Sequence, residues 1–212
     1  MSIATYAELV TALDGFSGYL HRGDLTAKIP DFIRVAESRI NRKLRVLLQE
    51  TESTLTATIG SRLMSVPTLF GTPIALWLET YEPRDELIYR TPNDLPVTDT
   101  NGGSDFYTVD GDNIATENPA DIAYSYTLRY WTKFDIASTS TNTVLTNYPD
   151  IYIYGTLVAS TAWTQDMSQL QFWAQQRDEA MAEAMADTRK TKGKATLRTE
   201  FGGLRPSIIK GY

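Results

Sequence analysis

The stretch Leu145-Thr-Asn-Tyr-Pro-Asp-Ile-Tyr-Ile-Tyr-Gly-Thr-Leu157 says most about the fold, because it predicts a helix built for packing. Asn147 is expected to cap this helix, and Pro149 fits its first turn. The residues that follow are apolar or amphipathic, and none of them is a nucleophile, a metal ligand or a phosphate-binding loop. The helix is therefore expected to make contacts, and it gives no support to an enzyme.

Composition limits the possible classes of protein. The 212 residues are 42% hydrophobic and 11% aromatic, which is enough for a core and suits one large domain or two small ones. Without cysteine, and with His21 as the only histidine, disulfides, thiol catalysis and zinc or histidine clusters are excluded. No catalytic centre, metal or cofactor is expected. Neither a membrane span nor a signal peptide is visible in the sequence.

Charge is unevenly spread along the chain. The net charge of −6 does not suggest a dedicated DNA-binding protein. From Arg189 onward, seven basic residues and one acid give +6, whereas the remaining 13 basic and 25 acidic residues give −12. The sequence therefore joins a basic tail to an acidic body.

The N-terminal segment predicts two helices. Residues 5–14 form the first, in which Thr5 and Glu8 fit a capping box. The second has Pro30 near its start, and its apolar residues recur at steps of three and four: Ile33, Ala36, Ile40 and Leu44.

From Glu50 the pattern becomes that of short strands separated by turn residues. In the last of them, Tyr124, Tyr126 and Tyr130 share one face, which suits a sheet with one packed side. The predicted strands span residues 51–59, 62–66, 74–81, 86–90, 106–109, 113–116 and 123–131.

The C-terminal third returns to helix after a polar link at 138–143. One helix is expected from about Tyr148 to Gln165, and another from after Ser168 to about Arg189. The predicted fold class is α+β. A helical bundle of the N- and C-terminal helices (1–49 and 145–192) would carry an inserted β-rich subdomain (50–135) and an extended C-terminal arm (193–212).

Candidate sites for chemistry have simpler interpretations. Asp110-Gly-Asp-Asn113 is far better explained as a hairpin turn than as a calcium loop. The basic residues of the second helix could contact nucleic acid, but Asp31 and Glu37 interleave with them, so an ion-paired, solvated face is favoured. A position at the edge of a protein–protein interface is compatible with both interpretations of this helix face. The residues expected at a subunit interface are Arg34, Arg39, Arg42, Tyr152 and Tyr154.

The C-terminal arm alternates basic and apolar residues, which is typical of a segment that orders on a partner surface. A frayed terminus is the alternative. The residues expected to bind the partner are Leu197, Arg198, Phe201, Leu204, Arg205, Ile208, Ile209 and Tyr212.

The sequence resembles the head–tail adaptor, or connector, proteins of short-tailed and related bacteriophages. The resemblance covers residues 5–13, 24–45 and the 145–157 stretch quoted above. Within the second of these, the run that carries it is Ile29-Pro-Asp-Phe-Ile-Arg-Val-Ala-Glu-Ser-Arg-Ile-Asn-Arg42. Residues 124–133 stand in the right order before that stretch, while residues 50–120 agree only in character.

The resemblance implies a structural virion protein of the phage neck without enzymatic activity, assembled in the host cytoplasm. It implies a ring, generally of twelve copies, beneath the portal protein, which the C-terminal arm would contact. Genomic DNA would pass through the lumen without specific binding, and tail, nozzle or tail-fibre proteins would attach below. No membrane is implied.

Two other classes of function stay open. One is a carbohydrate- or receptor-binding tail module that uses the aromatic residues of the β insert. The other is a tail-associated glycan hydrolase, which needs paired carboxylates in a cleft.

Overall fold

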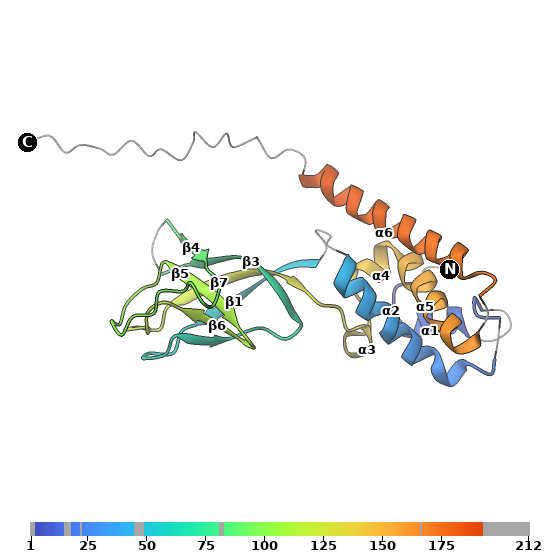
Figure 1. Cartoon of the computed structure of the whole chain (residues 1–212), viewed down its shortest axis with the longest axis horizontal. Helices are drawn as coiled ribbons and strands as arrows, with labels where there is room; N and C mark the ends of the chain where they lie inside the picture. Colours follow the sequence, from blue (N-terminus) through green and yellow to red (C-terminus); the bar gives the residue numbers. More distant parts are fainter. Residues whose placement is uncertain are drawn as a thin grey trace, which may run out of the picture.

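The computed structural model describes residues 3–14, 18–21, 23–44, 49–80, 83–165 and 167–192. These residues form an elongated molecule with a curled seven-stranded sheet at one end and six α-helices at the other (Figure 1). The mixed α+β class predicted from the sequence is confirmed.

The two N-terminal helices form as predicted. α1 (Tyr6–Leu13) begins at Thr5, whose hydroxyl accepts from the Glu8 backbone N–H at 3.3 Å, while the Glu8 carboxylate accepts from the Thr5 N–H at 3.1 Å. The backbone N–H groups of Ala4 and Thr5 both donate to the Glu8 carboxylate and lower its pKa. A single 3₁₀ turn, η1 (Thr26–Lys28), leads into α2 (Ile29–Lys43), which has Pro30 in its first turn.

The helix predicted to begin at about Tyr148 is preceded by two short helices that the sequence analysis did not predict. α3 (Ile136–Thr139) ends within the polar link at 138–143, and α4 (Thr143–Asn147) begins at its last residue. Short polar residues cap both helices, because the side chains of Asp135 and Asn142 each accept a backbone N–H three residues on. A polar run of this kind favours turns and helix starts equally.

Asn147 does not cap the helix that follows it, which corrects a prediction. It ends α4, and its side-chain amide donates to the Thr143 carbonyl at 2.7 Å. α5 (Pro149–Thr164) begins without a side-chain cap, and α6 (Leu170–Lys192) follows it. Pro149 does occupy the first turn of α5, as predicted.

α5 is buried over most of its length. Its residues from Ile151 to Thr161 are buried except for Tyr154, which is half-buried. The buried hydroxyls of Thr156, Ser160 and Thr161 donate to carbonyls of their own helix, so that polar residues are tolerated here. One cluster of buried side chains joins the N- and C-terminal helices: Leu9, Ile33, Ile40, Leu145, Ile151, Leu157, Met181 and their neighbours.

The sheet has the strand order β1-β7-β3-β4-β5-β6-β2. All neighbouring strands are antiparallel except β4 and β5, which are parallel. The strands are β1 (Glu50–Thr56), β2 (Leu63–Ser65), β3 (Phe70–Leu78), β4 (Asp85–Tyr89), β5 (Phe106–Asp110), β6 (Asn113–Thr116) and β7 (Ser125–Thr132).

The concave side of the sheet holds its own core. Tyr126, Leu128 and Tyr130 alternate along β7 and are buried together with Tyr124, as the period of two predicted. Elsewhere on β7, Arg129 forms a salt bridge to Glu50 at 2.6 Å and lies 3.8 Å from Glu52, which ties β7 to β1.

Candidate interaction surface at the junction of the two parts

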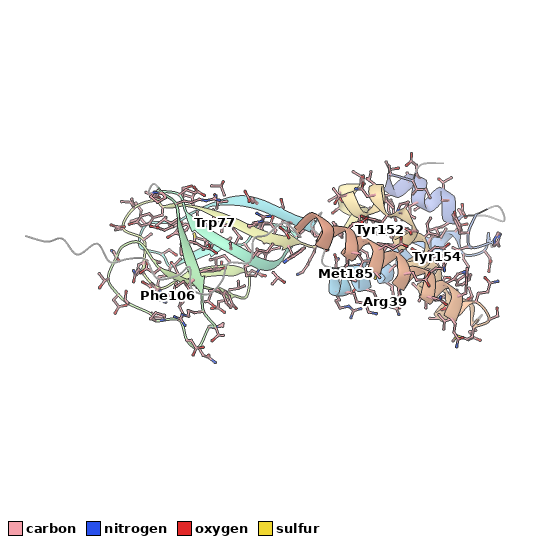
Figure 2. All side chains as sticks on the ribbon, turned by 90° about the horizontal axis from the view of Figure 1, so that it is seen from above. Arg39, Trp77, Phe106, Tyr152, Tyr154 and Met185 are labelled. Carbon is pink, nitrogen blue, oxygen red and sulfur yellow. The ribbon has the colours of Figure 1, made fainter. Side chains whose placement is uncertain are left out.

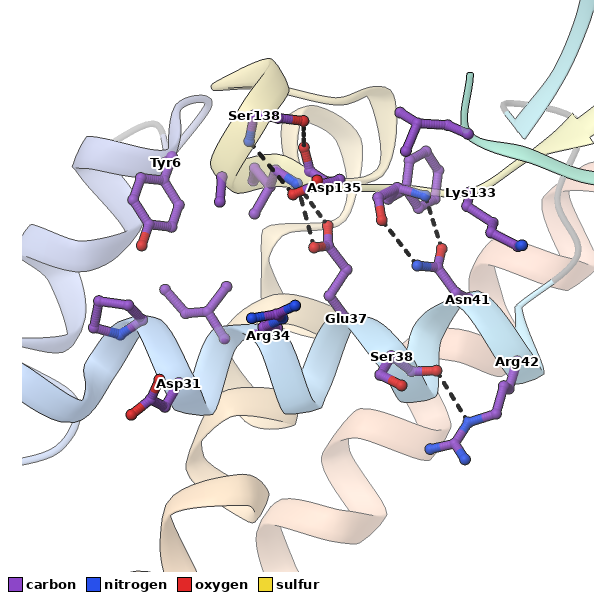
Figure 3. A pocket seen from close by; sticks show the side chains of 16 residues that line it. Tyr6, Asp31, Arg34, Glu37, Ser38, Asn41, Arg42, Lys133, Asp135 and Ser138 are labelled. Carbon is purple, nitrogen blue, oxygen red and sulfur yellow. Dashed lines mark hydrogen bonds between the residues drawn. The ribbon is translucent and has the colours of Figure 1, made fainter. Parts of the chain in front are cut away.

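A groove of about 860 Å³ lies where the helices meet the sheet. One wall is the part of α2 from Pro30 to Arg42, and the other is residues 133–138, which lead from β7 into α3 (Figure 3). Tyr6 and Leu69 complete the lining. We call this feature the junction groove.

Two polar side chains of α2, one turn apart, hold the chain segment that forms the second wall. The Ile136 N–H donates to the Glu37 carboxylate, at 3.0 Å from one oxygen and 3.2 Å from the other. The Asn41 side chain donates to the Phe134 carbonyl at 2.9 Å and accepts from the Phe134 N–H at 2.8 Å (Figure 3). Glu37 and Asn41, which we call the junction clamp, thus fix where the sheet returns to the helices.

Glu37 is buried, and its hydrogen bonds continue into the core. The Tyr152 hydroxyl donates to a Glu37 oxygen at 2.8 Å, and the Asn142 amide donates to the Tyr152 hydroxyl at 2.7 Å. Burial raises the pKa of Glu37, although the hydrogen bonds from Tyr152 and Ile136 work in the opposite direction. Burial and the neighbouring Glu37 also raise the pKa of Tyr152.

The position of Glu37 corrects the prediction of an ion-paired face on α2. Among the residues that the structure describes, no lysine or arginine lies within 4.0 Å of the Glu37 carboxylate. Its oxygens serve Ile136 and Tyr152 instead. The Glu37 carboxylate thereby joins α2 to residue 136 and to α5.

Three bases and three acids line the junction groove: Arg34, Arg42 and Lys133 with Asp31, Glu37 and Asp135. Arg34, Arg42 and Lys133 are exposed, and within the described ranges none of them forms an ion pair. Arg42 donates to the Ser38 carbonyl at 3.1 Å, and Asp31 lies 3.7 Å from Lys28 on the preceding turn. The formal charges of the groove lining therefore balance, although these three cations form no ion pair in the described part of the subunit.

The predicted interface residues lie in the helical part but in different environments (Figure 2). Arg34 and Arg42 are exposed, and Arg39 is half-buried. Tyr154 is half-buried against the helical core, while Tyr152 has no exposed surface and is an internal residue of the subunit. The predicted interface role therefore depends on the three arginines and Tyr154, for which it stays a prediction.

The predicted arm residues all lie outside the described residues. They are Leu197, Arg198, Phe201, Leu204, Arg205, Ile208, Ile209 and Tyr212.

Three residues of the junction groove were not identified from the sequence: Asn41, Ser38 and Lys133. Asn41 follows Glu37 by one helical turn, which was a usable signal that both side chains share a face. Their partners, however, lie 93 and 99 residues further along the chain, and no local pattern reveals such contacts.

The described part of the chain shows no group of three or more histidine, aspartate or glutamate side chains suited to holding a metal ion. None of its helices combines the length and the apolar character that crossing a membrane requires.

A comparison with protein families gives a match over most of the chain. The family model described as SU10 adaptor protein matches residues 4–200, which include every helix and strand described above. No curated protein matches the sequence. The chain therefore belongs to the SU10 adaptor protein family, and it is a structural adaptor protein of a bacteriophage.

Proposed function

We propose that this adaptor forms a homo-oligomeric ring of twelve copies, the number usual for such connectors, at the junction of head and tail. The ring would sit beneath the portal protein and extend the channel for the genome. Its lower face would receive tail or nozzle proteins and tail fibres, and assembly would take place in the host cytoplasm.

The observation that carries this proposal is the family match, which spans both the helical part and the sheet. The junction clamp supports it physically. An adaptor transmits load between two larger bodies, so its two parts need a fixed relation, and Glu37 and Asn41 provide one through hydrogen bonds to the backbone.

Charge supports passage of DNA without specific binding. Residues 50–135 contain 14 acidic and five basic residues. A lumen lined by such a surface offers few cationic contacts to phosphate groups, so DNA would slide past it without being retained.

The test is reconstitution with portal-bearing heads that lack tails. Purified adaptor should add a ring at the portal vertex, visible by cryo-electron microscopy with its symmetry counted, and the ring should be needed before tail proteins attach. Heads without portal are the control. Absence of adaptor density at the portal vertex, or its presence at the far tip of the tail, would contradict the proposal.

The sheet does not support the alternative of a receptor-binding module. It requires a row of exposed aromatic side chains, but Tyr107, Tyr124, Tyr126 and Tyr130 are buried. Among the described strand residues, Tyr89 is the aromatic side chain that is largely exposed.

A further inference from the structure

We propose that the end of the sheet farthest from the helices binds a tail protein, through a segment of that protein that carries aliphatic side chains beside lysine or arginine. This inference rests on the proposed function, in which tail proteins attach below the ring, and it names the surface and the chemistry of that attachment. Four exposed aliphatic side chains form the surface, which we call the distal patch: Ile59, Leu63, Val97 and Ile122.

Strand pairing brings two members of the distal patch to one segment of the chain, residues 115–122. Leu63 of β2 pairs with Ala115 of β6. Ile59 pairs with Ala120 in an isolated bridge, and the N–H after it donates to the Ala120 carbonyl at 2.8 Å. Segments that are separate in the sequence therefore present these two side chains close together.

The other two members of the distal patch belong to the same region. Val97 precedes Thr98, whose backbone N–H donates to the Glu117 carbonyl at 3.1 Å, and Ile122 is part of the segment itself. The four side chains are exposed over 46–65% of their surface. Single exposed aliphatic residues are common, but four around one short segment indicate a contact surface.

The distal patch lies at the opposite end of the sheet from the junction clamp. β7 begins beside the patch at Ser125 and ends at Thr132, shortly before α3 (Figure 1). Its 8 residues, at about 3.3 Å each, separate the two ends by about 25 Å. The patch is thus well placed to contact a protein that the helical part does not touch.

The loop that carries Val97 is long but fixed. Residues 91–105 form no strand or helix, and a loop of this length in a compact domain commonly binds a partner. The Asn118 side chain ties its two limbs together, because it accepts from the Thr98 hydroxyl at 2.5 Å and donates to the Gly103 carbonyl at 2.6 Å. A surface that is ordered beforehand loses little entropy on docking.

The charge around the distal patch favours a basic partner. Residues 91–105 and 117–123 contain five acids and no base, while residues 57–63 add one base, Arg62. Within the described residues none of these acids forms an ion pair: Asp94, Asp99, Asp105, Glu117 and Asp121. An aliphatic centre among unpaired acids is complementary to aliphatic side chains flanked by lysine or arginine. DNA phosphates would be repelled by these acids, as would the same end of a second copy.

The first experiment removes the apolar side chains. A variant with threonine in place of all four residues of the distal patch keeps residues suited to strands, so its Tm should be unchanged. Heads that lack the adaptor receive the purified full-length variant and then the purified tail proteins of the phage. Electron microscopy should show adaptor rings at the usual frequency but about tenfold fewer tailed particles, or fewer still.

The matched control is Ile88→Thr, which changes an exposed aliphatic residue of β4 outside the distal patch and should leave tail attachment normal. If the fourfold variant gains tails as the unaltered chain does, this surface is refuted and the ring stands. If it keeps its Tm but forms no ring, the patch is a contact with the portal or a neighbour, which also overturns the inference. If the unaltered chain adds no ring to heads, the proposed function itself fails.

The second experiment tests the chemistry of the partner by charge. Asp99→Lys combined with Asp121→Lys should lower tail attachment by about tenfold at low salt and reduce its salt dependence. Asp110→Lys combined with Asp112→Lys is the control, because these exposed acids precede β6 whereas the distal patch follows it. Normal attachment by the first variant would show that the partner segment is not basic.

A third measurement identifies the occupant directly. A photoreactive phenylalanine analogue in place of Val97, in assembled particles, should crosslink to a tail protein at a peptide that contains lysine or arginine beside aliphatic residues. The same analogue in place of Ile88 is the control and should not reach that peptide. A crosslink from position 97 to the portal, to DNA or to another adaptor copy overturns the inference.

Discussion

At the scale of single residues, the contribution of Glu37 to the stability of the fold can be tested directly. Glu37 is a buried carboxylate that accepts hydrogen bonds from two neutral donors, the Ile136 N–H and the Tyr152 hydroxyl. Glu37→Ala would leave the Ile136 N–H and the Tyr152 hydroxyl without an acceptor, so we expect a loss of about 2–4 kcal/mol in the free energy of unfolding. Glu37→Gln keeps an acceptor oxygen and should stay within about 1 kcal/mol of the unaltered chain at pH 7. Urea denaturation measures both, and equal losses for the two variants would contradict the assigned hydrogen bonds.

The same residue predicts a pH dependence. Burial raises the pKa of Glu37 in the folded state above its unfolded value of about 4.3, so the folded state binds more protons between these two values. The stability contributed by protonated Glu37 is complete below the unfolded pKa and is lost as the pH rises through the folded pKa. Subtracting the pH profile of Glu37→Gln from that of the unaltered chain should isolate this falling slope. A flat difference would show that Glu37 does not titrate in this way.

At the scale of elements, the contact between α2 and α5 depends on Gly155. A Cβ atom at this position would lie 3.3 Å from the Ala36 Cβ. The two helices therefore lie so close together that a side chain at position 155 would press against Ala36. Gly155→Leu should force them apart and cost about 1–3 kcal/mol. Thermal unfolding followed by circular dichroism would detect this as a lower Tm.

The matched control moves one methyl group across the same gap. Gly155→Ala combined with Ala36→Gly keeps the number of methyl groups and exchanges one favourable helix residue for another, so its Tm should stay near that of the unaltered chain. A normal Tm for Gly155→Leu would mean that the helices are not so close.

At the scale of the whole molecule, the C-terminal arm is expected to bind the portal protein. Removing residues 194–212 takes away four basic residues and the five large apolar anchors Phe201, Leu204, Ile208, Ile209 and Tyr212. Fixing about twenty residues costs roughly 1–2 kcal/mol each in backbone entropy, so those anchors must be buried on the partner. The truncated chain should therefore bind portal-bearing heads at least about tenfold more weakly in co-sedimentation.

The truncation should leave the subunit itself intact, because the buried clusters of the described part end at Ala184. An unchanged Tm is the control for folding. Heads that retain the truncated chain as tightly as the full chain would show that the arm is not the anchor.

What the sequence determined by itself was the kind and order of elements. The capping box of Thr5 and Glu8, Pro149 in the first turn of α5 and the alternation of Tyr124, Tyr126 and Tyr130 each depend on residues close together in the chain. Side-chain period and cap chemistry are local properties, so the sequence shows them directly. Where two local patterns competed, as in the polar run at 138–143, the sequence did not distinguish a loop from two short capped helices.

What only the tertiary structure decided was which residues face one another. Glu37 looks like part of a charged helix face, yet its partners are Ile136 and Tyr152, 99 and 115 residues away. Tyr152 looks like a contact residue, yet α5 is enclosed by the other helices and hides it. Burial and pairing depend on contacts between distant segments, and these form only when the whole chain packs. The junction groove follows from that packing.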